Sequence, residues 1–195
     1  MNRPVYRHGD LRRLIEPASI AVVGASPREG SFGNRLIRNL GRFRGRLHLV
    51  NARYDEIGGQ PCHPSLSALP EVPDCVVVAT GREQVEPLVI EAGRLGVGGI
   101  IVFASGFAET GKPERAGEQQ RIVELAQAAG VRLVGPNCIG VVNFIEGAVM
   151  TFSGTPVLER PRPDSIGLIS QSGALGFALA QAIENGVSFS HVLTS

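Results

Sequence analysis

The segment Ser19–Gly33, with the sequence SIAVVGASPREGSFG, decides the fold. Its first part, Ser19–Val23, is a short run of small and β-branched residues, as in strands that are buried on both faces. Glycines at positions 24, 30 and 33 then permit a tight turn, and a helix is predicted from Phe32 to Phe43. A strand, a glycine-rich loop and a helix in this order predict the first unit of a parallel sheet, with an anion-binding site where the helix begins.

The same pattern recurs along the chain. Further strands are predicted at Leu47–Val50, Cys75–Ala79, Gly99–Phe103 and Val131–Val134, further helices at Glu83–Leu95 and Pro113–Ala129, and a loop at Asp55–Pro70. The strands are continuous apolar runs that alternate with helices, which indicates right-handed βαβ units. We therefore expect an α/β fold with a doubly wound parallel sheet.

After Asn143 the rhythm changes. Ala148–Phe152 is a candidate strand, and the proline-rich, charged stretch Pro156–Asp164 is typical of a linker. A new strand, helix and strand are predicted at Ile166–Ile169, Gly173–Glu184 and Phe189–Leu193. We expect a Rossmann-like domain over residues 1–150, a linker over 151–164, and the beginning of a truncated, flavodoxin-like α/β domain over 165–195.

The composition excludes some function classes. The net charge of +1 gives no field that would attract nucleic acid or a membrane surface, and no apolar run is long enough to span a bilayer. The N-terminus lacks the apolar core of a signal peptide, so a cytoplasmic protein is expected. The three cysteines lack metal-ligand spacing and are interpreted as reduced thiols. Ten arginines within residues 1–46 are either a solvated face or a basic rim around a polyphosphate.

The residues after the first two strands bear on the kind of nucleotide. Ser26 stands where the dinucleotide fingerprint has its second glycine, and the second strand ends in Asn51-Ala52-Arg53 without the acid that would hold an unmodified ribose. An arginine suits a ribose that carries a phosphate, as in NADP or coenzyme A, although Arg53 is equally consistent with an ordinary surface residue. An NADP-dependent reductase is not favoured, since no Tyr-x-x-x-Lys pair occurs and Lys112 is the only lysine.

Small and hydroxylated residues follow the later strands and leave room for a slender ligand: Ala79-Thr80-Gly81, Ala104-Ser105-Gly106 and Gly135-Pro136-Asn137-Cys138-Ile139-Gly140. The segment Ser170–Gly173 again joins a strand to a helix start and predicts a second anion site. No nucleophile, histidine and acid occur as a set, so no catalytic residue and no metal ligand is predicted. The four histidines, His8, His48, His63 and His191, are interpreted as structural or surface residues.

Four segments together resemble the NDP-forming acyl-CoA synthetases, the superfamily that includes the α subunit of succinyl-CoA synthetase and the ADP-forming acetyl-CoA synthetases. They are Ile20–Gly33, Val50–Gly59, Val134–Asn143 (VGPNCIGVVN) and Gly167–Leu175 (GLISQSGAL). The resemblance extends from about Leu14 to the last residue. One departure is Ala52, which stands where the family usually has a proline.

The resemblance implies that the chain binds coenzyme A or acyl-CoA. Its cofactor contacts would be Gly24, Ala25, Ser26, Pro27, Arg28, Glu29 and Gly30 around the phosphates, Asn51 and Arg53 near the nucleotide, Ala79, Thr80, Gly81, Ala104, Ser105 and Gly106 along its course, and Asn137 and Cys138 at its thiol end. Residues Ser170, Gln171, Ser172 and Gly173 would hold the phosphate of a phosphohistidine.

By the same resemblance, the parent protein would be an ADP-forming acid–CoA ligase. Its phosphorylated histidine, and an ATP-grasp domain or subunit that uses ATP, ADP and Mg, would lie outside this chain, which would then bind without catalysing. Homo- or hetero-oligomers are both compatible with this arrangement. Two other parents remain open: a protein lysine acetyltransferase with a synthetase-like regulatory region that senses acetyl-CoA, and a stand-alone CoA-binding protein.

Overall fold

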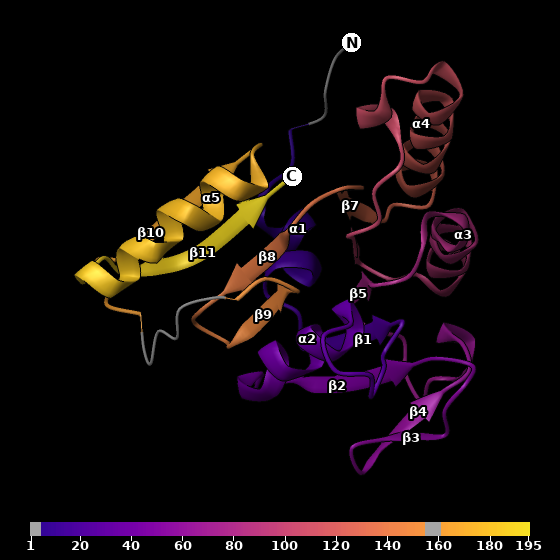
Figure 1. The fold of residues 1–195 in the computed structure, drawn as a ribbon, viewed down its shortest axis with the longest axis horizontal. Helices are drawn as coiled ribbons and strands as arrows, with labels where there is room; N and C mark the ends of the chain where they lie inside the picture. The colour runs from indigo at the N-terminus through magenta and orange to yellow at the C-terminus, as the bar shows by residue number, and fades with distance from the viewer. Residues whose placement is uncertain (1–4, 155–160) are drawn as a thin grey trace.

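The structure is a computed structural model that describes residues 5–154 and 161–195, and its centre is a seven-stranded sheet (Figure 1). The strand order is β3-β4-β2-β1-β5-β6-β7, with parallel pairing from β4 to β7. The strands are β1 (Ser19–Val23), β2 (Arg46–Val50), β3 (Glu56–Ile57), β4 (Gln60–His63), β5 (Cys75–Val78), β6 (Gly99–Val102) and β7 (Arg132–Val134). After β1 the chain adds β2 on one side of the sheet and later adds β5 on the other side, so the strand order reverses between β1 and β5. Doubly wound folds bind ligands at such a point.

Strand β1 is buried along its whole length, and its alternate side chains enter two different cores. Ile20 and Val22 pack in the core that includes Leu14 of α1 (His8–Ile15) and Leu36 of α2 (Phe32–Asn39). Ala21 and Val23 pack in the core beneath α3 (Val85–Leu95) and α4 (Pro113–Ala128). Helices therefore cover both faces of the sheet, and the predicted doubly wound α/β fold is confirmed.

Local sequence signals set the helix ends. Helix α2 begins after Ser31, whose hydroxyl accepts the N–H of Asn34 at 3.2 Å. Helix α3 ends at Gly96 in the left-handed conformation, and α4 has Pro113 in its first turn. The predicted helix Phe32–Phe43 is shorter, because α2 ends at Asn39 and a 3₁₀ helix follows at Leu40–Arg42. Other 3₁₀ helices are Leu66–Ala68, Arg82–Gln84, Ala108–Thr110 and Gln181–Asn185.

A second sheet has the order β10-β11-β8-β9 and lies beside the first (Figure 1). Its strands are β8 (Gly140–Asn143), β9 (Ala148–Thr151), β10 (Ile166–Ser170) and β11 (Phe189–Thr194), and α5 (Gly173–Ala180) packs on it. Strand β11 pairs parallel with β10 but antiparallel with β8. Val141 of β8 faces the core of the first sheet, whereas its neighbour Val142 faces the core under α5.

This pairing does not follow the predicted boundary at residue 150. Strand β8 precedes that boundary and β9 crosses it, yet both belong to the sheet of the C-terminal segment, because β8 pairs with β11 on one side and with β9 on the other. The predicted linker 151–164 begins inside β9 at Thr151, and its central part, residues 155–160, lies outside the described residues. Arg162 already belongs to the second unit, since its backbone N–H donates to the Ser188 hydroxyl.

Three other elements differ from the prediction. The predicted loop Asp55–Pro70 contains β3 and β4, which form a hairpin and extend the sheet beyond β2. The N-terminal segment, for which no element is predicted before Ser19, contains α1, which packs against β6 and β8. Strand β8 was not predicted. These segments are short and mix polar with apolar residues, so that no clear periodicity marks them.

Candidate nucleotide-binding site

The loop from Gly24 to Gly30 lies at the carboxyl end of β1 and leads into α2. Backbone N–H groups of Gly24 and Ala25 donate to the carbonyl of Val50, which fixes the start of the loop on β2. Among the described residues, no acceptor pairs with the backbone N–H groups of Ser26, Glu29 and Gly30. Free N–H groups at the start of a helix favour an anion, because the helix dipole adds positive potential there.

Two glycines of this unit are required by close packing. Gly24 has φ +87°, and a Cβ there would lie 2.9 Å from both the Ala79 carbonyl oxygen and Cγ2 of Thr80. A Cβ on Gly33 would lie only 2.0 Å from the carbonyl oxygen of Gly24. The lack of a Cβ at Gly24 keeps space open at the junction of β1 and β5, and the lack of a Cβ at Gly33 lets α2 pack tightly on β1.

Asn51 connects the turn after β2 to the glycine loop. Its side-chain amide donates to the Ala25 carbonyl at 2.8 Å, while its Oδ1 accepts the N–H of Arg53 at 3.0 Å. Asn51 therefore shapes the site from within the protein. Arg53 itself is exposed beside this turn, where its guanidinium is available to a ligand.

A cleft of about 490 Å³ opens beside these residues, on the side of the sheet that α3 covers. It combines the predicted residues Gly24, Asn51, Arg53 and Thr80 with residues that sequence reasoning missed: Pro64, Ser65, Gln84, Pro87, Leu88 and Glu91. Pro64 and Ser65 directly follow β4, which runs parallel to β2 and so ends at the same edge of the sheet. The sequence predicts a loop where β4 lies, so it does not indicate that Pro64 and Ser65 follow a strand.

Two buried polar atoms near the loop have no hydrogen-bond partner among the described residues. They are Oγ1 of Thr80, at the end of β5, and Oδ1 of Asn34, in the first turn of α2. The Asn34 amide group donates to the carbonyl of Ser26 at 3.5 Å, so its side chain lies against the glycine loop. A buried polar atom without a partner costs free energy, and a bound ligand or water would remove that cost.

The residues after β6 are held in place by the side chain of Glu109. The carboxylate of Glu109 accepts the N–H groups of Gly106 and Phe107. Partial burial raises the pKa of Glu109, but its backbone hydrogen bonds together lower that pKa below the usual value. Glu109 thus occupies the N–H of Gly106, so Ala104–Gly106 can line a ligand with surface and with the exposed Ser105, but not with that donor.

Asn137 and Cys138 follow β7 and differ in exposure. Asn137 is exposed, has φ +58°, and donates its N–H to the Ala104 carbonyl. The Cys138 thiol points into the core, only 4% exposed, and donates to the Val102 carbonyl. Burial raises the pKa of Cys138 to about 12, so the thiolate is not populated at neutral pH. Cys138 can therefore contribute to a site only through its backbone.

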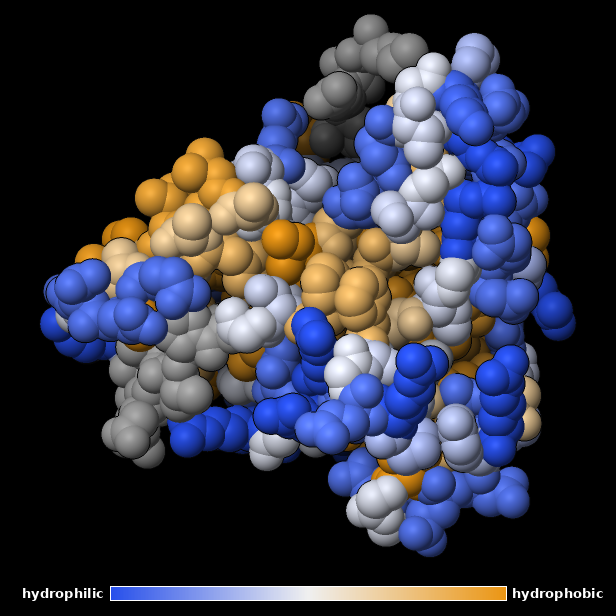
Figure 2. Space-filling model, in the orientation of Figure 1, coloured by the Kyte–Doolittle hydropathy of each residue, from blue (hydrophilic) through white to orange (hydrophobic). Residues whose placement is uncertain are grey.

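The second predicted anion site lies at the start of α5. The Ser172 hydroxyl accepts the N–H of Leu175 at 3.3 Å, and the Ser170 hydroxyl accepts the N–H of Ser172 at 3.1 Å. Gln171 is exposed in this turn, and Gly173 begins the helix. Around it the surface is apolar: Figure 2 shows apolar side chains over α5, and Ile166, Ile169, Leu175 and Leu179 are all about half exposed or more.

None of the four histidines lines the cleft, although the carbonyl of His63 accepts the N–H of Asn51. His8 pairs with Glu16 at 3.0 Å and His48 with Glu71 at 2.8 Å, while His63 is in β4. Burial lowers the pKa of His191 in β11, whose Nε2 is unpartnered within the described residues. Across residues 5–154 and 161–195, no cluster of three His, Cys, Asp or Glu side chains is arranged to hold a metal, and no helix is long and apolar enough to cross a membrane.

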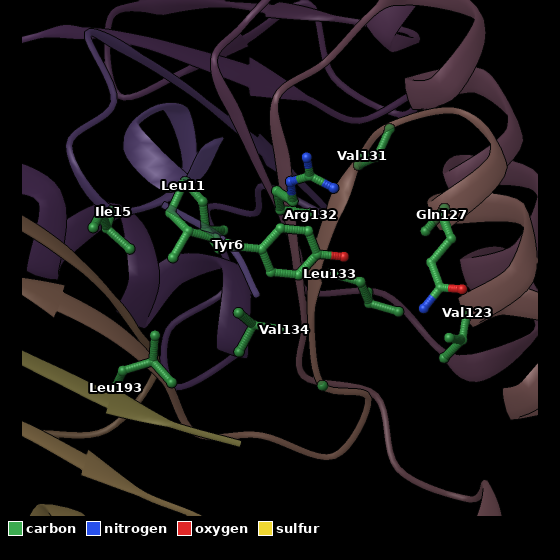
Figure 3. Close-up of a pocket in the computed structure, with 13 residues that line it drawn as sticks. Tyr6, Leu11, Ile15, Val123, Gln127, Val131, Arg132, Leu133, Val134 and Leu193 are labelled. Atoms are coloured by element: carbon green, nitrogen blue, oxygen red, sulfur yellow. The ribbon is translucent and has the colours of Figure 1, made fainter. Parts of the chain in front are cut away.

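Another hollow, of about 300 Å³, lies between α1, α4, β7 and the end of β11 (Figure 3). Leu11, Ile15, Val123, Val134 and Leu193 give it mostly apolar walls, and the Arg132 guanidinium lies 4.2 Å from the centre of the Tyr6 ring at its rim. None of its lining residues is a carboxylate, histidine or cysteine. We assign no chemistry to it.

The fold and the loop at the switch point define a doubly wound nucleotide-binding domain. The chain belongs to the family described as the CoA binding domain, whose model matches residues 18–144. It is 40% identical over 94% of its length to the ADP-forming acetate–CoA ligase I of Archaeoglobus fulgidus. It is 31% identical over 93% of its length to the ADP-forming 4-hydroxybutyrate–CoA ligase of Nitrosopumilus maritimus.

A solved structure agrees with these relatives. The dinucleotide forming acetyl-coenzyme A synthetase 1 of Ca. Korarchaeum cryptofilum, in its apo form, superposes with a TM-score of 0.84 at 32% identity over 94% of this chain. The family resemblance predicted from the sequence is confirmed. The chain spans only 26% of the length of the two ligases and 39% of the Korarchaeum chain.

Proposed function

We propose that this chain is the coenzyme A-binding portion of an ADP-forming acid–CoA ligase. One observation carries the proposal: the free N–H groups of the Gly24–Gly30 loop lie at the start of α2, next to a cleft bordered by Arg53. Coenzyme A joins a pyrophosphate to an adenosine that carries a 3′-phosphate, and these two features match an anion-binding loop beside a cleft that has Arg53 at its border. The ligase relatives support the same cofactor.

The residues present suit each part of the cofactor. The N–H groups of Ser26, Glu29 and Gly30 would hold the pyrophosphate, and the missing Cβ of Gly24 leaves the backbone open to it. The adenosine would enter the cleft, where Arg53 would pair with the ribose phosphate. The unpartnered Oγ1 of Thr80 would gain a hydrogen bond at the edge of the cleft.

The ligase reaction would need groups that the described residues do not supply. Cys138 is a buried thiol, and His8 and His48 are paired with carboxylates. We infer that the parent provides a histidine that carries phosphate and an ATP-grasp domain or subunit that uses ATP and Mg. In this arrangement the chain by itself binds coenzyme A in the cytoplasm without turnover.

The start of α5 would serve the phosphorylated histidine. Its N–H groups point out of an eight-residue helix that begins at Gly173, and the hydroxyls of Ser170 and Ser172 are part of the same turn. The exposed apolar side chains of β10 and α5 support the presence of a covering partner domain or subunit, since such a surface is unfavourable in water. One relative is itself named as a subunit alpha.

Calorimetry with coenzyme A, dephospho-CoA and NADP tests the proposal. The chain is expected to bind coenzyme A more tightly than dephospho-CoA, because only the former carries the phosphate that Arg53 pairs with. Arg53→Gln should weaken coenzyme A binding about 5-fold, roughly 1 kcal/mol for an exposed charge-assisted contact, and leave dephospho-CoA binding unchanged.

Arg94→Ala is the matched control, since Arg94 is an exposed arginine on α3 that does not line the cleft. Tighter binding of NADP than of coenzyme A would overturn the proposed cofactor. Equal affinity for coenzyme A and dephospho-CoA would remove the role given to Arg53.

A further inference from the structure

Three phenylalanine rings meet beside the glycine loop and form an aromatic cluster of Phe32, Phe103 and Phe152. The rings of Phe32 and Phe152 are stacked, with centroids 4.1 Å apart and an interplanar angle of 11°. Phe103 meets both rings edge-on, at 6.5 Å from Phe32 and 5.0 Å from Phe152. These are favourable geometries for aromatic pairs, so the cluster holds each ring in a defined orientation.

The cluster lies on the other side of the loop from the cleft. Phe32 is the first residue of α2 and follows the phosphate-binding loop directly, and Phe103 stands between β6 and the Ala104–Gly106 segment. The cleft takes its residues from the ends of β1, β2, β4 and β5 and from α3, and none of the three phenylalanines lines it. In the strand order, β6 lies on the side of β5 away from β2.

A ligand with its adenosine in the cleft and its pyrophosphate on the loop would therefore extend its remaining part toward β6. In coenzyme A that part is the pantetheine arm, an uncharged chain of methylenes and amides with two geminal methyl groups and a terminal thiol. The surface it would meet is apolar: Figure 2 shows apolar side chains in the middle of this face, between the places of β9 and β5 in Figure 1.

Phe32 is the exposed member of the cluster. Its side chain is 44% exposed, whereas Phe103 is 4% exposed and packs in the core. The first turn of a helix accepts polar residues, so the helix itself does not need an aromatic ring at this position. A large apolar side chain that is fixed by stacking yet left open to solvent presents a preorganised apolar face to a ligand.

We propose that the Phe32 ring, supported from behind by Phe152 and Phe103, forms the wall on which the pantetheine arm of coenzyme A lies. This inference rests on the proposed function. It assigns to Phe32 a contact with the arm and with the acyl-bearing end of the cofactor, while Arg53 and the glycine loop hold the nucleotide end. Phe32 is then a binding residue for the pantetheine arm, which is the part of coenzyme A that the adenosine nucleotide alone lacks.

The test compares two ligands with the same phosphates, coenzyme A and 3′-phosphoadenosine 5′-diphosphate, which lacks the arm. By calorimetry on the full chain, Phe32→Ala should weaken coenzyme A at least 5-fold and change the affinity for the arm-less nucleotide less than 2-fold. Ile90→Ala is the matched control, because Ile90 on α3 is 43% exposed and lies outside the cleft. It should alter neither affinity.

Phe32→Leu guards against loss of folding, since leucine keeps an apolar side chain at this place. In that variant the geminal methyl protons of bound coenzyme A should lose the upfield ring-current shift that they show in NMR spectra with the unsubstituted chain. If Phe32→Ala lowers the affinity for both ligands equally, or lowers neither affinity, the contact proposed between Phe32 and the pantetheine arm is wrong. If the unsubstituted chain binds neither ligand, the proposed function itself is wrong.

Discussion

Strands β1 and β10 begin the same kind of unit, yet the two units end in different environments. Each strand leads into a helix that is capped by a serine: the Ser31 hydroxyl accepts the N–H of Asn34 at 3.2 Å, and Ser172 accepts that of Leu175 at 3.3 Å. Strand β1 is nevertheless fully buried, whereas Ile169 of β10 is 80% exposed. The caps are local and follow from the residues, while burial depends on which elements pack on each side.

The two strand-to-helix connections also differ in the size of the anion that they can hold. The first runs from Gly24 to Ser31 and leaves several N–H groups without intramolecular partners. The second consists of Gln171 and Ser172, and the Ser170 hydroxyl already accepts the N–H of Ser172. A long glycine loop can surround a pyrophosphate, but a two-residue turn has room for one phosphate group. The same strand–turn–helix pattern thus predicts an anion in both places and a nucleotide in only the first.

The largest difference between the two units is expected in the stability lost when a buried glycine in each helix is replaced by alanine. In Gly33→Ala the new Cβ would lie 2.0 Å from a backbone oxygen that cannot move aside, and we expect a loss of about 3 kcal/mol or more. In Gly176→Ala it would meet a side-chain methyl of Thr194 at 2.7 Å and Cβ of Ser170 at 3.0 Å, which are wider contacts than at Gly33, and a smaller loss of about 1 kcal/mol is expected.

Urea denaturation measures both free energies of unfolding. Gly117→Ala on α4, where nothing lies within 4 Å, is the control and should be neutral or slightly stabilising. A loss at Gly176 as large as at Gly33 would show that the two helices are packed with equal rigidity and would break the comparison.

A smaller difference is expected from the strands themselves. Val22→Ala removes apolar contacts from the centre of β1 and should cost about 2 kcal/mol, since Val22 is fully buried. Ile169→Ala removes a larger side chain from β10, but this side chain is mostly in water, so the change should stay within about 0.5 kcal/mol.

Denaturation of both variants at several protein concentrations checks this pair. If Ile169→Ala is as costly as Val22→Ala, and the cost depends on concentration, then another copy of the chain covers β10 in solution.

The smallest effect is expected from pH at the junction of the two units. Burial lowers the pKa of His191, with Glu16 raising it and His8 lowering it to a smaller extent. The unfolded chain, with an ordinary histidine pKa of about 6.5, then binds more protons than the folded chain in the window just below that pH. Stability therefore falls as pH drops below about 6.5, until the folded pKa is passed.

Denaturation at pH 7 and pH 5 tests this sign. His191→Gln should lose less stability between the two pH values than the unsubstituted chain. An unchanged pH dependence in His191→Gln would show that this histidine does not titrate in the window.

Much of the fold was predictable because β1, β5 and β6 are continuous apolar runs between turn residues. Four of the predicted cofactor contacts, Gly24, Asn51, Arg53 and Thr80, line one cleft, because carboxyl ends of parallel strands share one edge of the sheet. Their part in binding a cofactor stays a prediction. The rest of the fold and of the cleft was not predictable, for physical reasons. Strands β3 and β4 are short and rich in polar residues, so that Pro64 and Ser65 were missed, and the orientation of the Cys138 thiol depends on packing around Val102.

The sequence by itself determined the first strand–loop–helix unit, its caps and its glycine positions, because each depends on residues adjacent along the chain. It also determined the family that the chain resembles, since the four segments that carry the resemblance are recognised from their residues alone. Only the tertiary structure decided that β8 pairs with β11 across the predicted boundary, that β10 is exposed while β1 is buried, and that Phe32, Phe103 and Phe152 meet. Such contacts join residues far apart in sequence, and their positions follow from packing of whole elements, which no local pattern records.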